Sequence, residues 1–281
     1  MEKSLKNLLR EHGLVLKKAY GQNFLTDNLL LEEIVSKACV TKDDTVLEIG
    51  CGAGALTSVL SKKAKRVVGY EIDTRLKPVL NETLSDCDNV EIVFSDIMKQ
   101  NLIDVEKKLG GEYIMVANLP YYITTPIIMK LLEDEINIEL IEVMIQEEVA
   151  LRFCAKPSSK DYGAITLAIN YYTEPSYVIS AKAKEFLPSP DVDSAVVKMD
   201  IKKEKIAVSD KELLFKIIKA SFAMRRKTLL NSLGSAGLMG VGKKELAEIL
   251  EKLEISENVR AENLSLEEYV KITECYFKNE L

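Results

Sequence analysis

The sequence is poor in the residues that carry metal and redox chemistry. His12 is its one histidine, and its five cysteines are widely scattered, with no Cys-x-x-Cys pair among them. An odd number of separated cysteines gives no disulfide framework, and a single imidazole offers neither a structural zinc site nor a histidine-based catalytic pair. We therefore expect no metal ion and no disulfide, so that any chemistry depends on amides, carboxylates, hydroxyls and a cofactor.

A long hydrophobic run and an excess of basic residues are also missing. No stretch approaches the ~18 uninterrupted apolar residues of a membrane-spanning helix, and no apolar signal-peptide segment follows the basic N-terminus. We expect a cytoplasmic protein without a membrane segment. The net charge of −6 excludes a uniformly basic surface that would attract nucleic acid at long range. Two local basic clusters, in residues 1–18 and at Arg225-Arg226-Lys227, are by themselves more typical of solvated faces than of RNA contacts.

A short apolar run with an abrupt polar end is found near the middle of the chain. Residues 113–117 are too few for a helix and too apolar for a half-exposed strand, which predicts a strand buried on both faces of a parallel sheet. Ligands lie just outside the carboxyl ends of such strands, where Asn118 stands. Pro120 restricts Leu119 to extended conformations, so the Asn118 side-chain oxygen and the Leu119 carbonyl can act as two neighbouring acceptors for an aromatic exocyclic amine. Tyr121 adds a ring for stacking, although an Asn-x-Pro turn beside a core tyrosine is the simpler interpretation of this motif alone.

Another predicted strand, over residues 45–49, runs directly into a glycine-rich turn. Gly50 and Gly52 let the backbone approach a ligand closely, and the helix that follows points its N-terminus at the same place. The next predicted strand, residues 66–72, brings Glu71 to its carboxyl end, where the carboxylate can accept hydrogen bonds from both hydroxyls of an adenosine ribose. This pair of features fits the loose dinucleotide fingerprint of nicotinamide enzymes as well as the closer glycine spacing of S-adenosylmethionine sites.

The strand predicted over residues 90–95 helps to choose between these cofactors. It ends in Asp96, whose carboxylate can accept a hydrogen bond from the adenine amine of a nucleoside cofactor. Successive strands that end in Gly50, Glu71, Asp96 and Asn118 form a cleft for one adenosine and one amine. A hydride-transfer enzyme has no obvious use for the acceptors at Asn118, which favours S-adenosylmethionine.

The rest of the chain predicts the remainder of an α/β domain followed by helices. In the first part we expect helices over residues 4–12, 28–38, 125–134 and 146–154, a further helix from after Thr57 to about residue 63, and strands over residues 138–145, 163–172 and 194–201. The last two strands are expected to be antiparallel and to close the sheet. Beyond residue 203 only helices are expected, over residues 211–233, 243–253 and 265–278, with Ser265 and Glu268 forming a capping box. This change of pattern predicts a domain boundary near residue 203.

Seven short motifs follow one another along the chain. They are Gly21-Gln22-Asn23-Phe24-Leu25, Glu48-Ile49-Gly50 with Gly52 and Gly54, Glu71-Ile72-Asp73, Ser95-Asp96, Asn118-Leu119-Pro120-Tyr121, Phe186-x-Pro188-x-Pro190 with Val192-Asp193-Ser194, and Arg225-Arg226-Lys227-Thr228. Each motif alone is weak, but in this order and spacing the set resembles the KsgA-type small-subunit rRNA adenine dimethyltransferases over nearly the whole chain. One departure is Cys51, where that family usually has proline, which changes the stiffness of the loop and introduces a thiol.

This resemblance implies a fold and a set of site residues. The fold is a Rossmann-like class I S-adenosylmethionine-dependent methyltransferase sheet, an α/β catalytic domain with a basic N-terminal helix in residues 1–203, followed by a small all-helical rRNA-contacting domain in residues 204–281. The implied cofactor site contains Gln22, Asn23, Leu25, Gly50, Gly52, Glu71, Ile72, Asp96 and Asn118. The target adenine would be held by Asn118, Leu119, Pro120, Tyr121 and Phe186, and RNA would be contacted by Arg225, Arg226 and Lys227.

The implied activity is transfer of methyl groups from S-adenosylmethionine to N6 of two adjacent adenines in the 3′-terminal hairpin loop of small-subunit rRNA, during ribosome biogenesis. The implied partners are the small ribosomal subunit and its rRNA, and we expect a monomer. Two alternatives stay open, an erythromycin-resistance methyltransferase that acts on large-subunit rRNA and a non-catalytic ribosome-assembly factor on the same fold. Enzymes of the first kind typically have isoleucine in place of Leu119 and are strongly basic, whereas the intact acceptor motif and acidic residues argue against the second.

Overall fold

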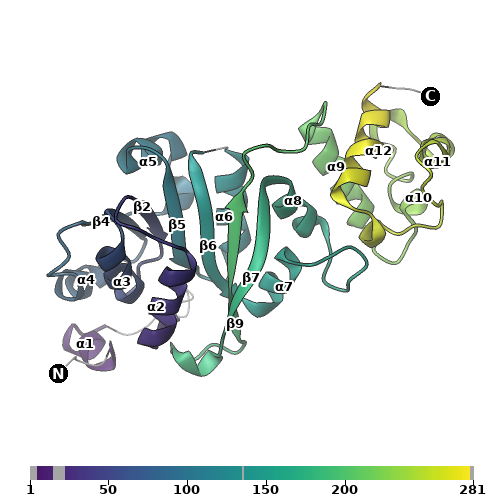
Figure 1. The fold of residues 1–281 in the computed structure, drawn as a ribbon. Helices are drawn as coiled ribbons and strands as arrows, with labels where there is room; N and C mark the ends of the chain where they lie inside the picture. The colour runs from purple at the N-terminus through teal and green to yellow at the C-terminus, as the bar shows by residue number, and fades with distance from the viewer. Residues whose placement is uncertain (1–4, 15–22, 135, 279–281) are drawn as a thin grey trace. The chain divides into compact units, whose positions relative to one another are not determined.

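The protein divides into two compact units in a computed structural model that describes residues 5–14, 23–134 and 136–278 (Figure 1). The first unit consists of Met1–Ala150 and Ser176–Ile201, and the second of Leu151–Pro175 and Lys202–Leu281. We refer to them as the sheet unit and the helical unit. Across the described ranges, none of the helices combines the length and the hydropathy that crossing a bilayer requires.

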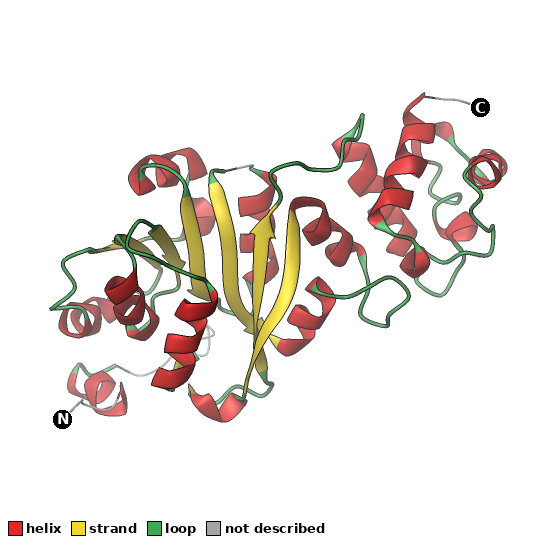
Figure 2. Ribbon diagram, in the orientation of Figure 1, coloured by secondary structure: helices red, strands yellow, loops and turns green. Residues whose placement is uncertain are grey.

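A seven-stranded sheet forms the centre of the sheet unit (Figure 2). The strands span Thr45–Ile49 (β2), Arg66–Glu71 (β3), Val90–Phe94 (β4), Tyr113–Asn118 (β5), Ile138–Gln146 (β6), Thr173–Ala181 (β7) and Ser194–Ile201 (β9). Their order is β4-β3-β2-β5-β6-β9-β7, in which β2 to β6 run parallel and β9 runs antiparallel to β6. Because β2 lies between β3 on one side and β5 on the other, the winding of the chain reverses at β2, and ligands bind outside the carboxyl ends of strands at such a point.

Helices α2 (Asn28–Lys37) and α3 (Ala55–Lys63) supply much of the hydrophobic core of the sheet unit. As predicted, α2 begins at Asn28. The side chain of its N-cap residue, Asp27, accepts hydrogen bonds from two backbone N–H groups of the first turn, at 2.9 and 3.2 Å. The apolar residues of both helices pack against buried residues of β2, β5 and β6. The other helices that begin in this unit are α1 (Leu5–Glu11), η2 (Thr74–Leu76), α4 (Lys77–Thr83), η3 (Ile97–Lys99), α5 (Leu102–Leu109), α6 (Thr124–Glu133), α7 (Glu147–Phe153) and η4 (Ala183–Glu185). A separate two-stranded sheet pairs β1 (Phe24–Leu25) with β8 (Phe186–Leu187).

The helical unit is built on three helices that contact one another, α8 (Ala164–Tyr172), α9 (Lys211–Phe222) and α12 (Leu266–Lys278). Its smaller elements are α10 (Leu229–Ser232), η5 (Leu238–Gly240), α11 (Lys243–Lys252) and η6 (Ala261–Asn263). The capping box predicted for the last helix is confirmed. Glu268 Oε2 accepts a hydrogen bond from the Ser265 N–H at 2.7 Å, and Ser265 Oγ accepts one from the Glu268 N–H at 3.3 Å.

The prediction of a strand over residues 163–172 is wrong, because this segment forms α8 and the strand β7 begins only at Thr173. The Gly163 N–H donates to Thr166 Oγ1 at 3.1 Å, which helps to start the helix. Most of the side chains of α8 are buried, so no polar face marks the helix in the sequence, and its aromatic and β-branched residues imitate a strand.

The prediction of one helix over residues 211–233 is also wrong. The helix α9 ends at Phe222, and α10 begins only at Leu229, after the N-cap Thr228. The Leu229 N–H donates to the Val259 carbonyl at 2.7 Å, so a contact distant in sequence replaces the helical hydrogen bond at this point. The basic triplet Arg225-Arg226-Lys227 therefore lies in the turn between two helices.

The division into units differs from the predicted domain boundary in one respect. The chain enters the helical unit for the last time at Lys202, close to the predicted boundary after residue 203. Residues 151–175, however, were predicted in the catalytic domain and belong to the helical unit instead. The cause is α8, whose apolar side chains pack with α9 and α12 rather than closing the sheet.

Candidate active site

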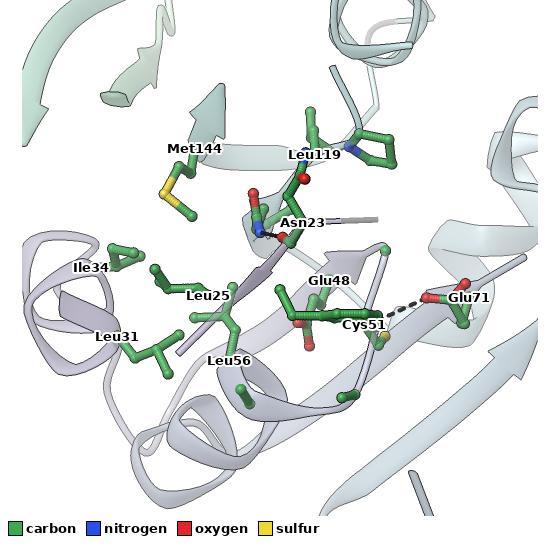
Figure 3. Close-up of a pocket in the computed structure, with 18 of the residues that line it drawn as sticks. Asn23, Leu25, Leu31, Ile34, Glu48, Cys51, Leu56, Glu71, Leu119 and Met144 are labelled. Carbon is green, nitrogen blue, oxygen red and sulfur yellow. Dashed lines mark hydrogen bonds between the residues drawn. The ribbon is translucent and has the colours of Figure 1, made fainter. Parts of the chain in front are cut away.

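A pocket lies at the carboxyl ends of β2, β3 and β5 (Figure 3). Its lining comes from segments that are far apart in the sequence: Asn23, Phe24 and Leu25; Gly50, Cys51, Gly52 and Ala53; Glu71 and Ile72; Asn118, Leu119, Pro120 and Tyr121; and Leu31, Ile34, Glu48, Ala55, Leu56, Ala117 and Met144. The pocket thus brings together most of the residues that the sequence predicts for a cofactor and a target base.

The glycine turn after β2 requires glycine at two positions for different reasons. Gly50 has a φ of 82°, in the left-handed region, and its N–H donates to the Tyr70 carbonyl at 2.8 Å. At Gly52 a Cβ atom would lie 2.7 Å from the ring of Phe24, so the ring lies directly against the bare backbone. The turn is therefore a cradle of backbone atoms at the N-terminus of α3, the arrangement that a polar or anionic part of a ligand can approach.

The Glu71 carboxylate holds this turn while lining the pocket. Its Oε2 accepts a hydrogen bond from the Gly52 N–H and its Oε1 one from the Asp73 N–H, both at 2.8 Å. Burial raises the pKa of Glu71, and the two N–H groups oppose that increase. A carboxylate has about four acceptor positions, so not all are used within the protein and a ligand such as a ribose can still donate to it.

The Asn118 side chain has a defined orientation at the end of β5. Its Nδ2 donates to the Asn23 carbonyl at 3.1 Å, which leaves Oδ1 as the acceptor of the amide. The Leu119 N–H donates to the Met144 carbonyl of β6 at 3.2 Å, so the sheet ladder continues one residue past the strand. The Thr124 hydroxyl donates to the Pro120 carbonyl at 3.1 Å and closes the turn. The acceptor motif is therefore held by hydrogen bonds on both sides.

Tyr121 completes the lining next to the acceptor motif. Its hydroxyl lies 2.6 Å from Ser194 Oγ, in β9, and burial raises the pKa of this phenol. A phenol with a raised pKa stays neutral at physiological pH, so its ring is available as a flat surface while its hydroxyl is paired.

Three predicted site residues are placed elsewhere or are not described. Phe186 is 4% exposed, pairs with Leu25 across the short antiparallel ladder of β1 (Phe24–Leu25) and β8 (Phe186–Leu187), and packs in the core instead of lining the pocket. Its expected stacking beside the base stays a prediction. Asp96 follows β4 at the same edge of the sheet but does not line the pocket, and it accepts a hydrogen bond from the Met98 N–H at 3.0 Å. Gln22 lies outside the described residues.

Glu48 is a pocket residue to which the sequence analysis assigned no role. It is 1% exposed, and its Oε2 has no hydrogen-bond partner among the described residues. Burial, more than the nearby negative charge of Glu71, raises the pKa of Glu48 to about 8. The signal in the sequence was a glutamate inside the otherwise apolar strand β2, where an unpaired carboxyl group is costly.

Cys51 occupies a space that Gly69 leaves open. A Cβ atom at Gly69 of β3 would lie 2.4 Å from Cys51 Sγ, so the thiol fills the gap above the glycine. Cys51 is 5% exposed, and burial raises its pKa well above the usual value for a thiol. Cys51 is therefore a buried packing group with an unreactive thiol, and the neighbouring Gly50 and Gly52 have φ values of 82° and 57°.

The mostly parallel sheet, the glycine turn after its central strand and the acidic residue after the next strand define a class I S-adenosylmethionine-dependent methyltransferase. The model of the ribosomal RNA adenine dimethylase family matches residues 13–278, and the chain belongs to this family. It is an S-adenosylmethionine-dependent rRNA adenine methyltransferase, so the nicotinamide alternative is rejected.

Two curated relatives named ribosomal RNA small subunit methyltransferase A resemble the chain over almost its whole length. The protein of Clostridioides difficile is 45% identical over 267 residues, covering 94% of this chain and 92% of the relative. The protein of Bacillus licheniformis is 44% identical over 274 residues, covering 96% of this chain and 94% of the relative.

Two solved structures share the fold. A dimethyladenosine transferase from Plasmodium falciparum has a TM-score of 0.78 and 25% identity, covering 92% of this chain and 98% of that one. The 23S rRNA methyltransferase ErmE has a TM-score of 0.69 and 26% identity, covering 90% of this chain and 98% of that one. Because the ErmE structure is named for 23S rRNA and the curated relatives for the small subunit, the fold alone does not define the RNA.

Proposed function

We propose that this protein transfers methyl groups from S-adenosylmethionine to N6 of two adjacent adenines in the 3′-terminal hairpin loop of small-subunit rRNA, giving N6,N6-dimethyladenosine during ribosome biogenesis. Support for this substrate comes from relatives that are 45% and 44% identical and carry the small-subunit name, whereas the similarity to ErmE is 26%. The large-subunit alternative is therefore the less favoured of the two.

The cofactor is proposed to lie along the glycine turn. The backbone of Gly50 and Gly52 would face its polar amino-acid part, and the free acceptor positions of Glu71 its ribose hydroxyls. Ile72 is 45% exposed and lines the pocket beside Glu71, where an apolar side chain can cover an adenine ring. We also propose Asn23 and Leu25 as contacts from the segment opposite the glycine turn.

We propose Asp96 as the acceptor for the adenine amine of the cofactor. It follows β4, next to β3, and the Ser95 N–H donates to the Glu71 carbonyl at 2.9 Å, which connects the two acidic positions. One carboxylate oxygen of Asp96 is engaged by the Met98 N–H, and the other is 3.8 Å from Lys99 Nζ. Contact with an adenine would use the remaining acceptor positions of this carboxylate.

The observation that carries the proposal is the orientation of the Asn118 amide. Since Nδ2 is bound by the Asn23 carbonyl, Oδ1 can accept one N6–H of an adenine while the Leu119 carbonyl accepts the other. Two acceptors withdraw the amine from conjugation with its ring and direct the nitrogen lone pair away from them, toward an electrophile. When bound, S-adenosylmethionine supplies a sulfonium methyl group and leaves as a neutral thioether.

The residues of the chain accelerate this step by position. Asn118 and Leu119 orient the nucleophile, Tyr121 offers a ring on which the base can stack, and the N6 proton is finally released to water. The base must be unpaired or flipped out of a helix to reach the pocket. Each N6 is methylated twice, since the first product retains one proton and its lone pair.

We further propose that the reaction needs no metal ion, because the thioether leaving group is neutral and develops no charge that a metal would stabilise. We also propose that the enzyme works in the cytoplasm and as a monomer.

The proposed partner is the small ribosomal subunit, contacted through the helical unit at the basic turn around Arg226 and Lys227. These two side chains are exposed and make no ion pair within the described residues, whereas Arg225 binds Glu262 at 3.0 Å and the Lys160 carbonyl.

Incubation with methyl-labelled cofactor and separated ribosomal subunits from a strain that lacks the modification tests the function. We expect label in small subunits, recovered as N6,N6-dimethyladenosine after digestion, and little in large subunits. Label mainly in large-subunit rRNA would replace this proposal by the erythromycin-resistance activity. Cofactor binding without any labelled RNA would refute the proposed substrate and leave the cofactor site intact.

A further inference from the structure

The hydroxyl of Tyr121 has a dedicated partner inside the protein. Ser194 Oγ lies 2.6 Å from it, and Ser194 is fully buried at the first position of β9, opposite Gln146 of β6. A buried serine side chain that reaches a pocket tyrosine does not serve strand pairing, because strand pairing uses backbone groups. The hydrogen bond therefore acts on the orientation of the Tyr121 ring.

Asp193, the residue before Ser194, holds the backbone at the start of β9 and so fixes the position of the Ser194 hydroxyl. The Asp193 carbonyl accepts a hydrogen bond from the Glu147 N–H at 3.0 Å. Its Oδ1 accepts one from the Ala183 N–H at 2.9 Å, and its Oδ2 one from Lys182 Nζ at 3.0 Å. Three bonds thus hold the backbone at the start of β9, so Ser194 is a rigid anchor for the phenol.

We propose that Ser194 is a positioning residue that sets the ring of Tyr121 as the stacking surface for the target adenine. This inference rests on the proposed function. The Tyr121 side chain can rotate about two bonds, and the anchor at its hydroxyl selects one orientation of the ring. Without the anchor the ring samples several orientations, and N6 of a stacked base is less often in line with the methyl donor. Ser194 acts through Tyr121 and contacts neither substrate.

A double-mutant cycle tests the coupling. The variants are Ser194→Ala, Tyr121→Phe and the double variant, and kcat and KM are measured with unmethylated small subunits. We expect each single substitution to lower kcat/KM by roughly fivefold or more, the scale of one lost hydrogen bond. The double variant should lose no more than either single variant, because both substitutions remove the same bond.

Two further variants separate positioning from folding. Ser194→Thr keeps the hydroxyl and should recover most of the kcat/KM that Ser194→Ala loses. Ser61→Ala is the matched control, since Ser61 is a buried serine of the same unit whose hydroxyl donates to the Ser58 carbonyl at 2.8 Å, and it should leave kcat/KM unchanged. Calorimetry should give the same S-adenosylmethionine affinity for every variant.

The outcomes distinguish this inference from the proposed function. If wild-type protein methylates small subunits but the two single losses add up in the double variant, Ser194 does not act through the Tyr121 hydroxyl. If Ser194→Ala fails to fold, Tyr121→Phe still removes the bond, and wild-type kcat/KM in that variant overturns the proposal. Absence of methylation by the wild-type protein refutes the proposed function, and the positioning role with it.

Discussion

Substitution of Glu71 tests the cofactor side of the pocket with a magnitude that follows from its hydrogen bonds. Its carboxylate accepts from the Gly52 and Asp73 N–H groups and has acceptor positions left for the ribose. A hydrogen bond to a charged group contributes about 1.5–3 kcal/mol. Glu71→Ala should therefore weaken S-adenosylmethionine binding by about 1.5–3 kcal/mol, which is roughly 10- to 150-fold in Kd.

The same substitution has a separate effect on the free protein. Alanine leaves the Gly52 and Asp73 N–H groups without their acceptor at a buried place, which should lower the free energy of unfolding by about 1–3 kcal/mol. Glu71→Gln keeps the length of the side chain and one carbonyl acceptor, so its losses in binding and stability should both be smaller than those of Glu71→Ala.

Isothermal titration calorimetry with S-adenosylmethionine measures the binding effect, and thermal unfolding measures the stability effect. Glu91→Gln is the matched control, because Glu91 is a partly exposed glutamate on the neighbouring strand β4, where it pairs with Arg66 and Lys108. Its affinity for the cofactor should equal that of the wild type. A folded Glu71→Ala variant with unchanged affinity would show that this carboxylate supports the glycine turn and does not hold the ribose.

Three further variants test other parts of the structure. Asn118→Ala should lower single-turnover methylation at saturating cofactor at least ~100-fold, the scale of losing an oriented group at the reacting centre, and near-normal turnover would refute its role. Replacing Arg226 and Lys227 by glutamine should weaken RNA binding and reduce its salt dependence, without changing the affinity for the cofactor. Arg225 is kept because it pairs with Glu262. Unchanged RNA binding together with a changed cofactor affinity would mean that the turn has a structural role. Glu142 is fully buried with both carboxylate oxygens unpaired among the described residues, and burial raises its pKa to about 8. The folded state therefore keeps a proton that the unfolded state loses, so stability should fall as the pH rises toward about 8. Glu142→Gln should raise the free energy of unfolding by up to ~4 kcal/mol at about pH 9 and change it little below about pH 5. An equal effect at the two pH values would contradict a raised pKa of Glu142.

The sequence predicted the strands of the site better than the direction of individual side chains. Buried parallel strands produce short apolar runs, and glycine, an acid or an asparagine directly after such a run marks its carboxyl end, as at Gly50, Glu71 and Asn118. The position of Phe186 along the chain did not reveal that its ring packs in the core, because the direction of the side chain depends on the register of β1 with β8.

Other errors have their own physical causes. The helix α8 has almost no polar face, so neither helical nor strand periodicity could identify it. The helix predicted through Arg225 is interrupted where Leu229 bonds to the distant Val259 carbonyl, a contact that no local pattern contains. Glu48 received no role because a carboxyl group within a strand shows its chemistry only once its burial is known.

The contact between Cys51 and Gly69 links two positions in evolution. A Cβ atom at residue 69 would lie 2.4 Å from Cys51 Sγ and 2.8 Å from Ile92 Cδ1, so a substitution there needs compensating changes at both neighbours. Gly69 itself lies in β3 and does not line the pocket, so its constraint comes from packing and not from contact with a ligand. A substitution at Gly69 alone is therefore expected to displace Cys51 and, through it, to distort the glycine turn.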